Sequence, residues 1–447
     1  MKKILCNLFV ILVFSANAQS NLQLSKILIN NVYIFNGKDN KLSKGNILIE
    51  NNLIKTISTR FIETDKSGLV QIIDGQGKYI IPGLIDAHSH IMLESIPQAK
   101  ALTSEFAFLA LFAANCSEKQ LLRGFTTVRD LGGGALVLHK AIDEGIVVGP
   151  RIFASGAFIS QTGGHGDFGM PTDVPRKLGE LSYMEINGMA ALADGEDQVL
   201  MRSREQLRQG ATQLKLMAGG GVSSNYDPLD VTQYTEAEFK AAVGAAENWG
   251  TYVTVHAYTP QAIMTAIKSG VKCIDHGQLA DEETAKLMAE KGIWWSLQPF
   301  LDDEEAIPFP AGSANRKKQL EMTQGTDNAY KLAKKYKIKT AWGTDCLFDQ
   351  SLAMKQGKQL SKMTRWYTPF EVLKMATYDN AQLLAMSGKR SPYQEGKLGE
   401  ITEGAYADLI LIDGNPLENI RLIEDPETNF KIIIKDGKIY KNKLIER

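Results

Sequence analysis

The histidines of this sequence are few, and most of them stand where they could share one task. His88 and His90 form HSH after a short apolar run, and in an extended segment their rings project from the same face. His256 ends YVTVHAY, His276 ends CIDHG, and Asp345 follows TAWGT. Neutral imidazoles with a carboxylate are the ligands expected for zinc or a related first-row metal. HSH alone would equally fit two exposed histidines, but the combined set predicts a metal site.

A lysine interrupts another apolar run, ATQLKLMAGGG (residues 211–221). No carboxylate lies within four residues of Lys215, and a buried, unpaired ammonium costs on the order of several kcal/mol. A neutral amine could react with CO2 to give a carbamate, an anionic ligand with two oxygens that can bridge two metal ions. The alternative is a lysine whose ammonium reaches out to solvent. The neighbouring candidate ligands favour the carbamate.

The elements that must position these residues alternate between strands and helices. Short apolar runs separated by amphipathic stretches, such as 236–246 and 260–269, indicate βα units and a parallel sheet. Eight units predict an α/β fold, a (β/α)8 TIM barrel over residues 81–395, with its active site at the C-terminal strand ends. The predicted strands are 83–88, 126–130, 151–154, 213–217, 252–256, 273–276, 294–298 and 340–343.

Two connections in this region are long, and both follow predicted strands. Residues 158–199 follow the third strand, and residues 300–327 follow the seventh. Long βα loops commonly carry lids or binding residues. We expect these two loops to form the walls of the substrate pocket.

The two ends of the chain have a different pattern. Residues 19–80 and 396–447 contain short apolar runs separated by Asn, Asp and Gly, which is typical of antiparallel strands. Both ends are therefore predicted to form one small β-sandwich domain, with the barrel inserted between them.

The first 18 residues have the three parts of a secretory signal peptide. Two lysines precede an apolar run over residues 4–14, and ANAQ supplies a small-residue cleavage site after Ala18. The run is shorter than the roughly 20 residues of a membrane span. Cys6 lies inside the apolar run, so no lipid anchor is expected. We expect a soluble, secreted or periplasmic mature enzyme.

Charge and cysteine content exclude several classes of protein. The net charge is −1, and no basic stripe points to a nucleic acid or an anionic membrane as partner. Beyond the signal peptide, the three cysteines are too few and too far apart for a disulfide framework, and buried thiols are expected. They are Cys116, Cys273 and Cys346. The sequence does not determine the oligomeric state, and a homo-oligomer is possible.

In this order, the motifs resemble those of the amidohydrolase superfamily. They are IIPGLIDAHSH, the strand-borne Lys215, VTVHAY, IDHG and AWGTD, followed by GKLGEITEGAYADLILIDGNPL from the returning β-sandwich segment. The resemblance covers nearly all of the mature chain, and it implies two divalent cations, with zinc favoured. One would be held by His88, His90 and Asp345, and the other by His256 and His276. Carboxylated Lys215 and a hydroxide would bridge them.

That resemblance also implies a mechanism. Two adjacent cations lower the pKa of a shared water towards about 7, so that hydroxide attacks an amide carbonyl. Asp345 would accept the proton of this hydroxide and pass it to the leaving amine.

Two further segments resemble a group of bacterial dipeptidases with prolidase-like members, which cleave Xaa-Pro, Xaa-Arg or N-acyl amino-acid amides. They are SQTGGHGD (160–167) and SSNYDPLDVTQYT (223–235). His165 is a candidate for both catalysis and substrate binding, because its ring could hydrogen-bond the substrate carbonyl or oxyanion. The alternative is that His165 only stabilises its loop. Tyr226 and Tyr234 are candidates for binding the substrate carboxylate, although buried tyrosines commonly just pack.

Other polar and aromatic residues are expected to be structural. Arg129 and Asp130, in TTVRDLGGG, fit an ion pair or loop anchor, and His139 lies in a helical pattern. Trp294, Trp295 and Trp342 are expected to pack inside the barrel. Two rival functions remain: a cyclic-amide hydrolase resembling imidazolonepropionase, and an exported metal- or peptide-binding protein without catalysis.

Overall fold

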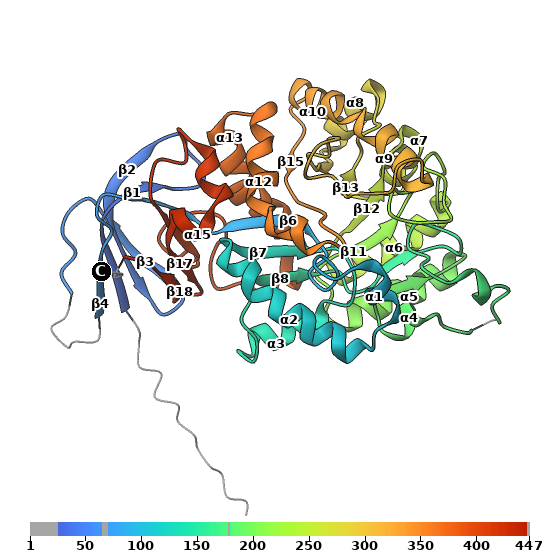
Figure 1. Cartoon of the computed structure of the whole chain (residues 1–447), viewed down its shortest axis with the longest axis horizontal. Coiled ribbons are helices and arrows are strands. Elements are labelled where there is room, and N and C mark those ends of the chain that lie inside the picture. The colour runs from blue at the N-terminus through green and yellow to red at the C-terminus, as the bar shows by residue number, and fades with distance from the viewer. Residues whose placement is uncertain (1–25, 65–69, 178, 445–447) are drawn as a thin grey trace, which may run out of the picture.

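A barrel occupies the middle of the chain in the computed structural model, which describes residues 26–64, 70–177 and 179–444. The predicted signal peptide lies outside these residues. Within the described part, eight parallel strands form a (β/α)8 barrel, which confirms the predicted fold class (Figure 1). Every predicted barrel strand corresponds to an observed one. They are β6 (Leu84–Ser89), β7 (Phe125–Asp130), β8 (Arg151–Ala154), β11 (Leu214–Met217), β12 (Val253–Ala257), β13 (Cys273–His276), β14 (Trp294–Ser296) and β15 (Thr340–Ala341).

Backbone hydrogen bonds join the barrel strands into one ring. Strands β6 to β8 pair in order, and so do β11 to β15. At one seam the amide of Thr212 donates to the carbonyl of Ala154 (2.8 Å), and at the other Ala87 donates to Trp342 (3.1 Å). The C-terminal ends of all eight strands therefore open on the same face.

Two short strands in the loop after β8 were not predicted. Strand β9 (Phe158–Ser160) pairs with β11 and so extends the third barrel strand, and β10 (Ala190–Leu192) pairs with β9. Gly156 separates β8 from β9 with a φ of 76°, a conformation that interrupts an extended strand. The segment AAL of β10 lacks the β-branched residues that mark strands in a sequence.

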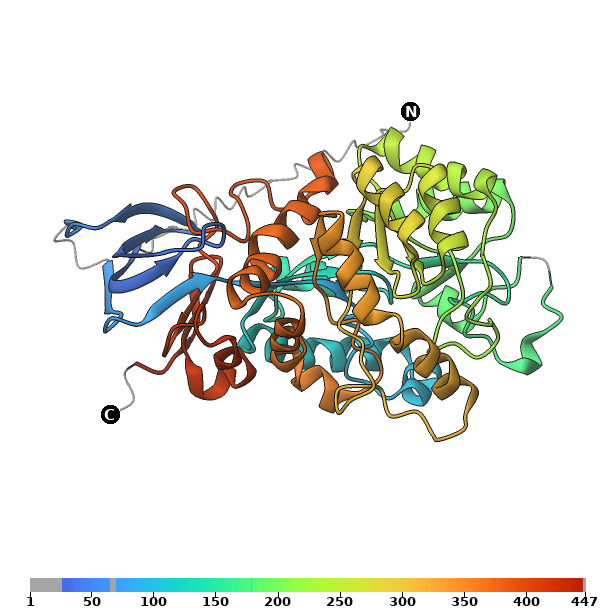
Figure 2. The ribbon, with the colours of Figure 1, turned by 90° about the horizontal axis from the view of Figure 1, so that it is seen from above.

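Helices cover the outside of the barrel (Figure 2). Helix α6 shows how the sequence delimits them: Thr235 and Glu238 form a capping box at its start, and Gly250 ends it with a left-handed φ of 83°. The longer helices are α2 (Phe106–Leu122), α3 (Leu136–Asp143), α5 (Glu196–Arg208), α6 (Glu236–Trp249), α7 (Pro260–Lys268), α8 (Glu282–Lys291), α9 (Ala314–Thr323) and α10 (Thr326–Lys335). The shorter ones are α1 (Gln98–Thr103), α4 (Tyr183–Ile186), α11 (Gln350–Met354), α12 (Gln356–Ser361), α13 (Pro369–Lys374), α14 (Asn380–Leu384) and α15 (Pro426–Asn429).

Both ends of the chain meet in a separate sheet at one end of the molecule (Figures 1 and 2). Strand β16 comes from the C-terminal segment and pairs antiparallel with β5 from the N-terminal one. The strand order is β18-β17-β16-β5-β1-β2-β3, with β4 beside β1. Their bounds are β1 (Lys26–Phe35), β2 (Leu42–Glu50), β3 (Leu53–Ser58), β4 (Val70–Asp74), β5 (Tyr79–Pro82), β16 (Leu409–Ile412), β17 (Phe430–Lys435) and β18 (Lys438–Asn442).

The residues expected to be structural are buried. Trp294, Trp295 and Trp342 lie in the core, and Trp342 stacks on Phe125 with ring centroids 5.7 Å apart. The three described cysteines are buried free thiols. In the described segments we find no helix of the length and apolar character that a membrane span requires.

Candidate active site

Asp345 lies at the centre of a histidine cluster at the C-terminal ends of the barrel strands. Its Oδ1 atom is 3.2 Å from Nε2 of His88 and 3.3 Å from Nε2 of His90, and its Oδ2 atom is 4.0 Å from Nδ1 of His276. One ligand atom each of His88, His276 and Asp345 lie within 4.8 Å of one another. His256 completes the set, because its ring centroid is 4.5 Å from that of His276. The fold thus brings together all five residues that the sequence singled out.

Two of these residues have unusual backbone conformations. His276 has a φ of 73° and Asp345 a φ of 49°, both in the left-handed region that few non-glycine residues adopt. Residues held in this region cluster at functional sites. Gly343 brings the two sides of the site together, because a Cβ atom there would lie 2.4 Å from the backbone nitrogen of His88.

Backbone carbonyls and one amide orient the imidazoles. Nδ1 of His90 is 3.0 Å from the carbonyl of Gly132, and Nε2 of His256 is 3.0 Å from that of Gly220. Gln298 lies between two rings, with Oε1 2.8 Å from Nδ1 of His276 and Nε2 3.3 Å from Nδ1 of His88. Such outer partners fix ring orientation in metal sites. Gln298 was not predicted, since a glutamine carries no signal of this role.

Lys215 projects into the barrel and is fully buried, but it is not alone. Its Nζ donates to Oδ2 of Asp275 at 2.7 Å, and the hydroxyl of Thr254 donates to the same oxygen at 2.7 Å. The apparent lack of a carboxylate partner is therefore wrong. Asp275 is 60 residues away along the chain, beyond the reach of a local search, and was not predicted.

Arg129 supplies the second partner of Asp275. Its Nη2 donates to Oδ1 of Asp275 at 2.7 Å, and its Nε donates to the carbonyl of Ala87 at 2.6 Å. Burial opposes ionisation of Asp275, but Lys215 and Arg129 outweigh it and hold its pKa well below the usual range. Burial lowers the pKa of Lys215; Asp275 opposes this effect, and Arg129 adds to it. The prediction of a structural ion pair at Arg129 agrees with this geometry.

The donor set fits divalent cations. Burial lowers the pKa values of His256 and His276 well below the ordinary value, so both imidazoles are neutral, as ligation requires. Burial also opposes ionisation of Asp345, but His88 and the other rings hold its pKa well below its usual range and keep it anionic. For His90, burial lowers the pKa, but Asp345 and Asp130 outweigh this and raise it. A cation would replace the protons that these rings share with Asp345.

His165 lies against this cluster. Its ring stacks on that of His256 with centroids 4.0 Å apart. Nδ1 is 2.8 Å from the hydroxyl oxygen of Ser224 and 3.5 Å from Oδ2 of Asp227. Gly221 leaves room for the ring, because a Cβ atom there would lie 1.9 Å from its Cε1. Residues 221–227, which follow Lys215 in the chain, therefore position the His165 ring.

The two candidate tyrosines lie elsewhere. Tyr234 is buried, and its hydroxyl donates to the carbonyl of Ala193 at 3.1 Å. Tyr226 is 43% exposed and donates to the carbonyl of Gly169 at 2.6 Å. Neither lines the pocket beside Asp345. Tyr258, the tyrosine of VTVHAY, does line this pocket. It is buried, and its ring centroid is 5.2 Å from that of His276. It was not predicted as a candidate from the sequence.

A buried carboxylate, also not predicted, ties the first and last barrel strands together. Asp86 accepts hydrogen bonds from the amides of His88 and Thr344, both at 3.0 Å. The hydroxyl of Thr344 and the amide of Gln356 donate to its other oxygen at 2.6 and 2.8 Å. Asp86 thus fixes the backbone at both His88 and the residue before Asp345.

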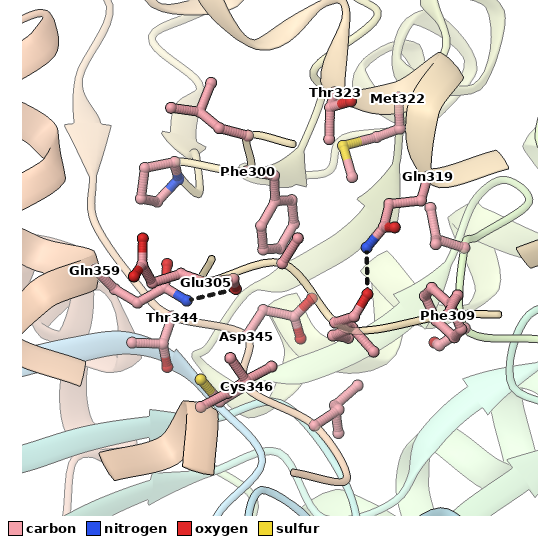
Figure 3. A pocket seen from close by; sticks show the side chains of 18 of the residues that line it. Phe300, Glu305, Phe309, Gln319, Met322, Thr323, Thr344, Asp345, Cys346 and Gln359 are labelled. Atoms are coloured by element: carbon pink, nitrogen blue, oxygen red, sulfur yellow. Dashed lines mark hydrogen bonds between the residues drawn. The ribbon is translucent and has the colours of Figure 1, made fainter. Parts of the chain in front are cut away.

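A pocket opens next to Asp345 (Figure 3). It holds about 680 Å³ of space free of protein atoms, part of which is open to solvent. Asp345, His165 and Tyr258 lie on the side of the histidine cluster, and residues 299–309 and 344–347 supply much of the wall. Both long loops expected to form pocket walls therefore contribute: the loop after β14 supplies most of the wall, and the loop after β8 supplies His165.

Comparisons with known proteins agree with this geometry. Residues 79–441 match the model of the amidohydrolase family. Ochratoxinase of Aspergillus niger is 32% identical over 375 residues, which are 81% of this chain and 75% of that protein. A prolidase crystallised with N-methylphosphonate-L-proline is 32% identical, with a TM-score of 0.83 over 94% of this chain and all of the other. A Xaa-Pro dipeptidase with methionine bound in its active site is 31% identical, with a TM-score of 0.79 over the same shares.

Proposed function

The chain belongs to the amidohydrolase family, and from this membership we propose an exported dipeptidase or N-acyl amino-acid hydrolase that uses two divalent cations. The family and its relatives identify a hydrolase of amide or peptide bonds. The observation that carries the finer proposal is the convergence of four histidines and Asp345 at one barrel rim, with Lys215 buried close enough for its charge to add to burial in lowering the pKa values of His256 and His276.

The same residues divide into two ligand sets. His88, His90 and Asp345 would hold one cation, and His256 and His276 the other. Lys215, carboxylated on its amine, would contribute an oxygen to each. When bound, the cations would polarise the substrate carbonyl and make hydroxide available near neutral pH.

Residues of the chain would carry the proton and position the substrate. Asp345 is anionic and faces the rings of three histidines, so it would accept a proton from the attacking water and pass it to the leaving amine. The ring of His165, held by Ser224, would donate a hydrogen bond to the substrate oxygen that becomes negative. Tyr258 is buried in the same pocket and would help to exclude water.

The relatives support a peptide-like substrate. The prolidase and the Xaa-Pro dipeptidase act on peptides, as their names state, and both are more than 30% identical to this chain. Ochratoxinase, as its name states, acts on ochratoxin, so relatives of this chain are not all named for dipeptides. Dipeptides and N-acyl amino acids are therefore the first substrates to test.

The test is a release assay with the zinc-loaded protein on Xaa-Pro, Xaa-Arg, Xaa-hydrophobic and N-acyl amino-acid substrates. We expect turnover of at least one class and two cations per chain by elemental analysis. An exposed-residue variant, Phe61→Asp (76% exposed), serves as a control and should match the parent. Complete lack of turnover would contradict the proposal and favour a cyclic-amide substrate.

Export is part of the proposal and rests on residues 1–18 alone. Expression of the full chain in a two-membrane bacterium, followed by N-terminal sequencing of the periplasmic fraction, should give a protein that begins at Gln19. A chain that retains Met1 in the cytoplasm would contradict export without affecting the proposed hydrolysis.

A further inference from the structure

The wall of the pocket that faces Asp345 is apolar. Phe300 lies in the pocket near Asp345 (Figure 3). Its ring centroid is 6.1 Å from that of His276. Phe300 and Phe309 pack against a small hydrophobic cluster whose buried members include Tyr258 and Met322. The pocket therefore continues directly from the candidate catalytic residues into apolar surroundings.

Part of this apolar surface is left uncovered by the protein. Phe300, Ile307 and Phe309 line the pocket, and each is only partly buried. Covering apolar surface of this kind is favourable by roughly 25 cal/mol per Å². An apolar group of a ligand would complete the packing that these three side chains begin.

Apart from Asp345, the carboxylates and ammonium groups that line the pocket, those of Glu305 and Lys362, are already paired. Glu305 lies 2.7 Å from Nζ of Lys358 and 3.1 Å from Nζ of Lys362. Lys362 also lies 2.7 Å from Asp303. A charged substrate side chain would have to compete with these partners, so the pocket favours an uncharged one.

The apolar wall is held in place without regular secondary structure. The side-chain amide of Gln319 donates to the carbonyl of Ile307 at 3.0 Å, and that of Gln359 donates to the carbonyl of Glu305 at 3.3 Å (Figure 3). Thr326 donates to the carbonyl of Phe300 at 2.6 Å. Because its backbone is tied at three points, the wall is formed before substrate binds, which favours affinity.

We propose that this pocket binds a large apolar side chain of the substrate, such as that of phenylalanine or leucine, and disfavours arginine and glycine. The inference rests on the proposed function for its substrate backbone and on Phe300, Ile307 and Phe309 for its side-chain preference. Ile307 and Phe309 are the residues that would determine specificity, because they lie in the wall and not among the candidate ligands.

The experiment uses two series of dipeptides with the zinc-loaded protein. In one series Xaa follows alanine, and in the other Xaa precedes it, with Xaa being Phe, Leu, Arg, Pro or Gly. In one of the series we expect kcat/KM for Phe or Leu to exceed that for Gly and Arg by about tenfold or more. Phe309→Asp should lower the Phe-to-Gly ratio of kcat/KM at least about fivefold.

Controls separate a pocket effect from a folding effect. Phe61→Asp makes the same exchange on an exposed residue of the β-domain and should leave the ratio unchanged. Ile307→Ala, a milder change, should lower the ratio if Phe309→Asp fails to fold. Faster cleavage of the Arg or Gly substrates, or an equal loss for all substrates in both variants, would overturn the inference.

A binding measurement distinguishes failure of the inference from failure of the proposed function. Calorimetric titration with N-acetylphenylalanine, N-acetylarginine and N-acetylglycine uses the Asp345→Asn background, in which cleavage of these candidate substrates should be slowed at least about 100-fold. Tighter binding of N-acetylphenylalanine, weakened in Phe309→Asp, would support the pocket assignment even if no dipeptide were cleaved. Equal or weaker binding of N-acetylphenylalanine would overturn it.

Discussion

Lys215 and Asp275 face each other inside the barrel, from strands on either side of β12. Nζ and Oδ2 are 2.7 Å apart, and both side chains are fully buried. Arg129 lies 2.7 Å from the other oxygen of Asp275, so one carboxylate serves two basic groups. Arg129 alone balances the charge of Asp275. Burial lowers the pKa of the Lys215 amine although Asp275 opposes this, and reaction with CO2 requires the neutral amine.

Asp275→Asn is expected to destabilise the protein strongly. The substitution leaves the Arg129 guanidinium buried beside a neutral amide, and removal of one partner of a buried ion pair costs roughly 3–5 kcal/mol. Denaturant unfolding of the chelator-treated protein measures this loss without a contribution from bound cations. Asp302→Asn, which breaks an exposed pair with Arg316, should cost less than about 1 kcal/mol. Equal stability of both variants would contradict the buried-pair account.

His165→Phe is expected to lower kcat without removing cations. Phenylalanine keeps the stacking on His256 but lacks the N–H group, and loss of one such donor costs about 10²–10³-fold in kcat. Elemental analysis and steady-state kinetics are the two measurements. His139→Phe is the matched control, because His139 lies on α3 and pairs with Asp143. Full activity of His165→Phe would leave His165 as a loop-stabilising residue.

Asp345→Asn tests the proton-transfer role. The amide can still face a cation but does not accept a proton, so turnover should fall by about 10²–10⁴-fold. Steady-state turnover and the metal content must be measured on the same sample, because Asp345 is also a candidate ligand. A variant that retained both cations and full turnover would contradict the assignment.

The pH dependence of stability is expected to reveal a second buried lysine. Lys435 donates to the carbonyl of Gly149 at 2.9 Å, and burial lowers its pKa to about 8, with Arg151 adding to the effect. Below pH 8 both the folded and unfolded states carry the proton, and the folded state bears the full cost of burial. Between pH 8 and about 10.5 only the unfolded state still binds it, so stability rises with pH.

Lys435→Met removes this titration. At pH 7 the variant should be more stable than the parent by up to roughly 3 kcal/mol, since each pKa unit corresponds to about 1.4 kcal/mol. The difference should shrink as pH rises from 8 towards about 10.5. Urea unfolding at pH 7 and pH 10 measures it, with the exposed Lys438→Met as control. A difference independent of pH would refute the expectation.

Strand positions and candidate ligands could be predicted because both have local signals. Each barrel strand is a short apolar run, and His256, His276 and Asp345 follow such runs directly. Parallel strands in a barrel bring these ends to one rim. The eightfold alternation was therefore enough to place five candidate ligands together.

Partners that join distant segments could not be predicted. Asp86 and Thr344 are separated by 258 residues, and Lys215 and Asp275 by 60. Their pairing depends on the order of strands around the barrel and on side-chain direction, which have no local pattern. The pocket wall formed by residues 299–309 could not be predicted either. It has no strand or helix periodicity, and Gln319 and Gln359 from other segments hold it in position.

Lys215→Ala tests the bridging role most directly. If Lys215 is a carboxylated ligand, the variant should lose cations and turnover together, because both proposed cations depend on it. A short carboxylic acid such as formate, acetate or propionate should restore part of both by entering the space left by the side chain. Elemental analysis and turnover with and without the acid are the measurements.

Lys435→Met is the matched control for this experiment, since it also removes a buried lysine but lies far along the chain, in the β-domain strand β17. It should retain cations and turnover, and added acid should not change either. If Lys215→Ala lost only stability, with cation content unchanged, Lys215 would be a partner of Asp275 and nothing more. Recovery by the acid separates the two roles, because a carboxylate can replace a lost ligand but would add negative charge beside the freed Asp275 if no cation were bound.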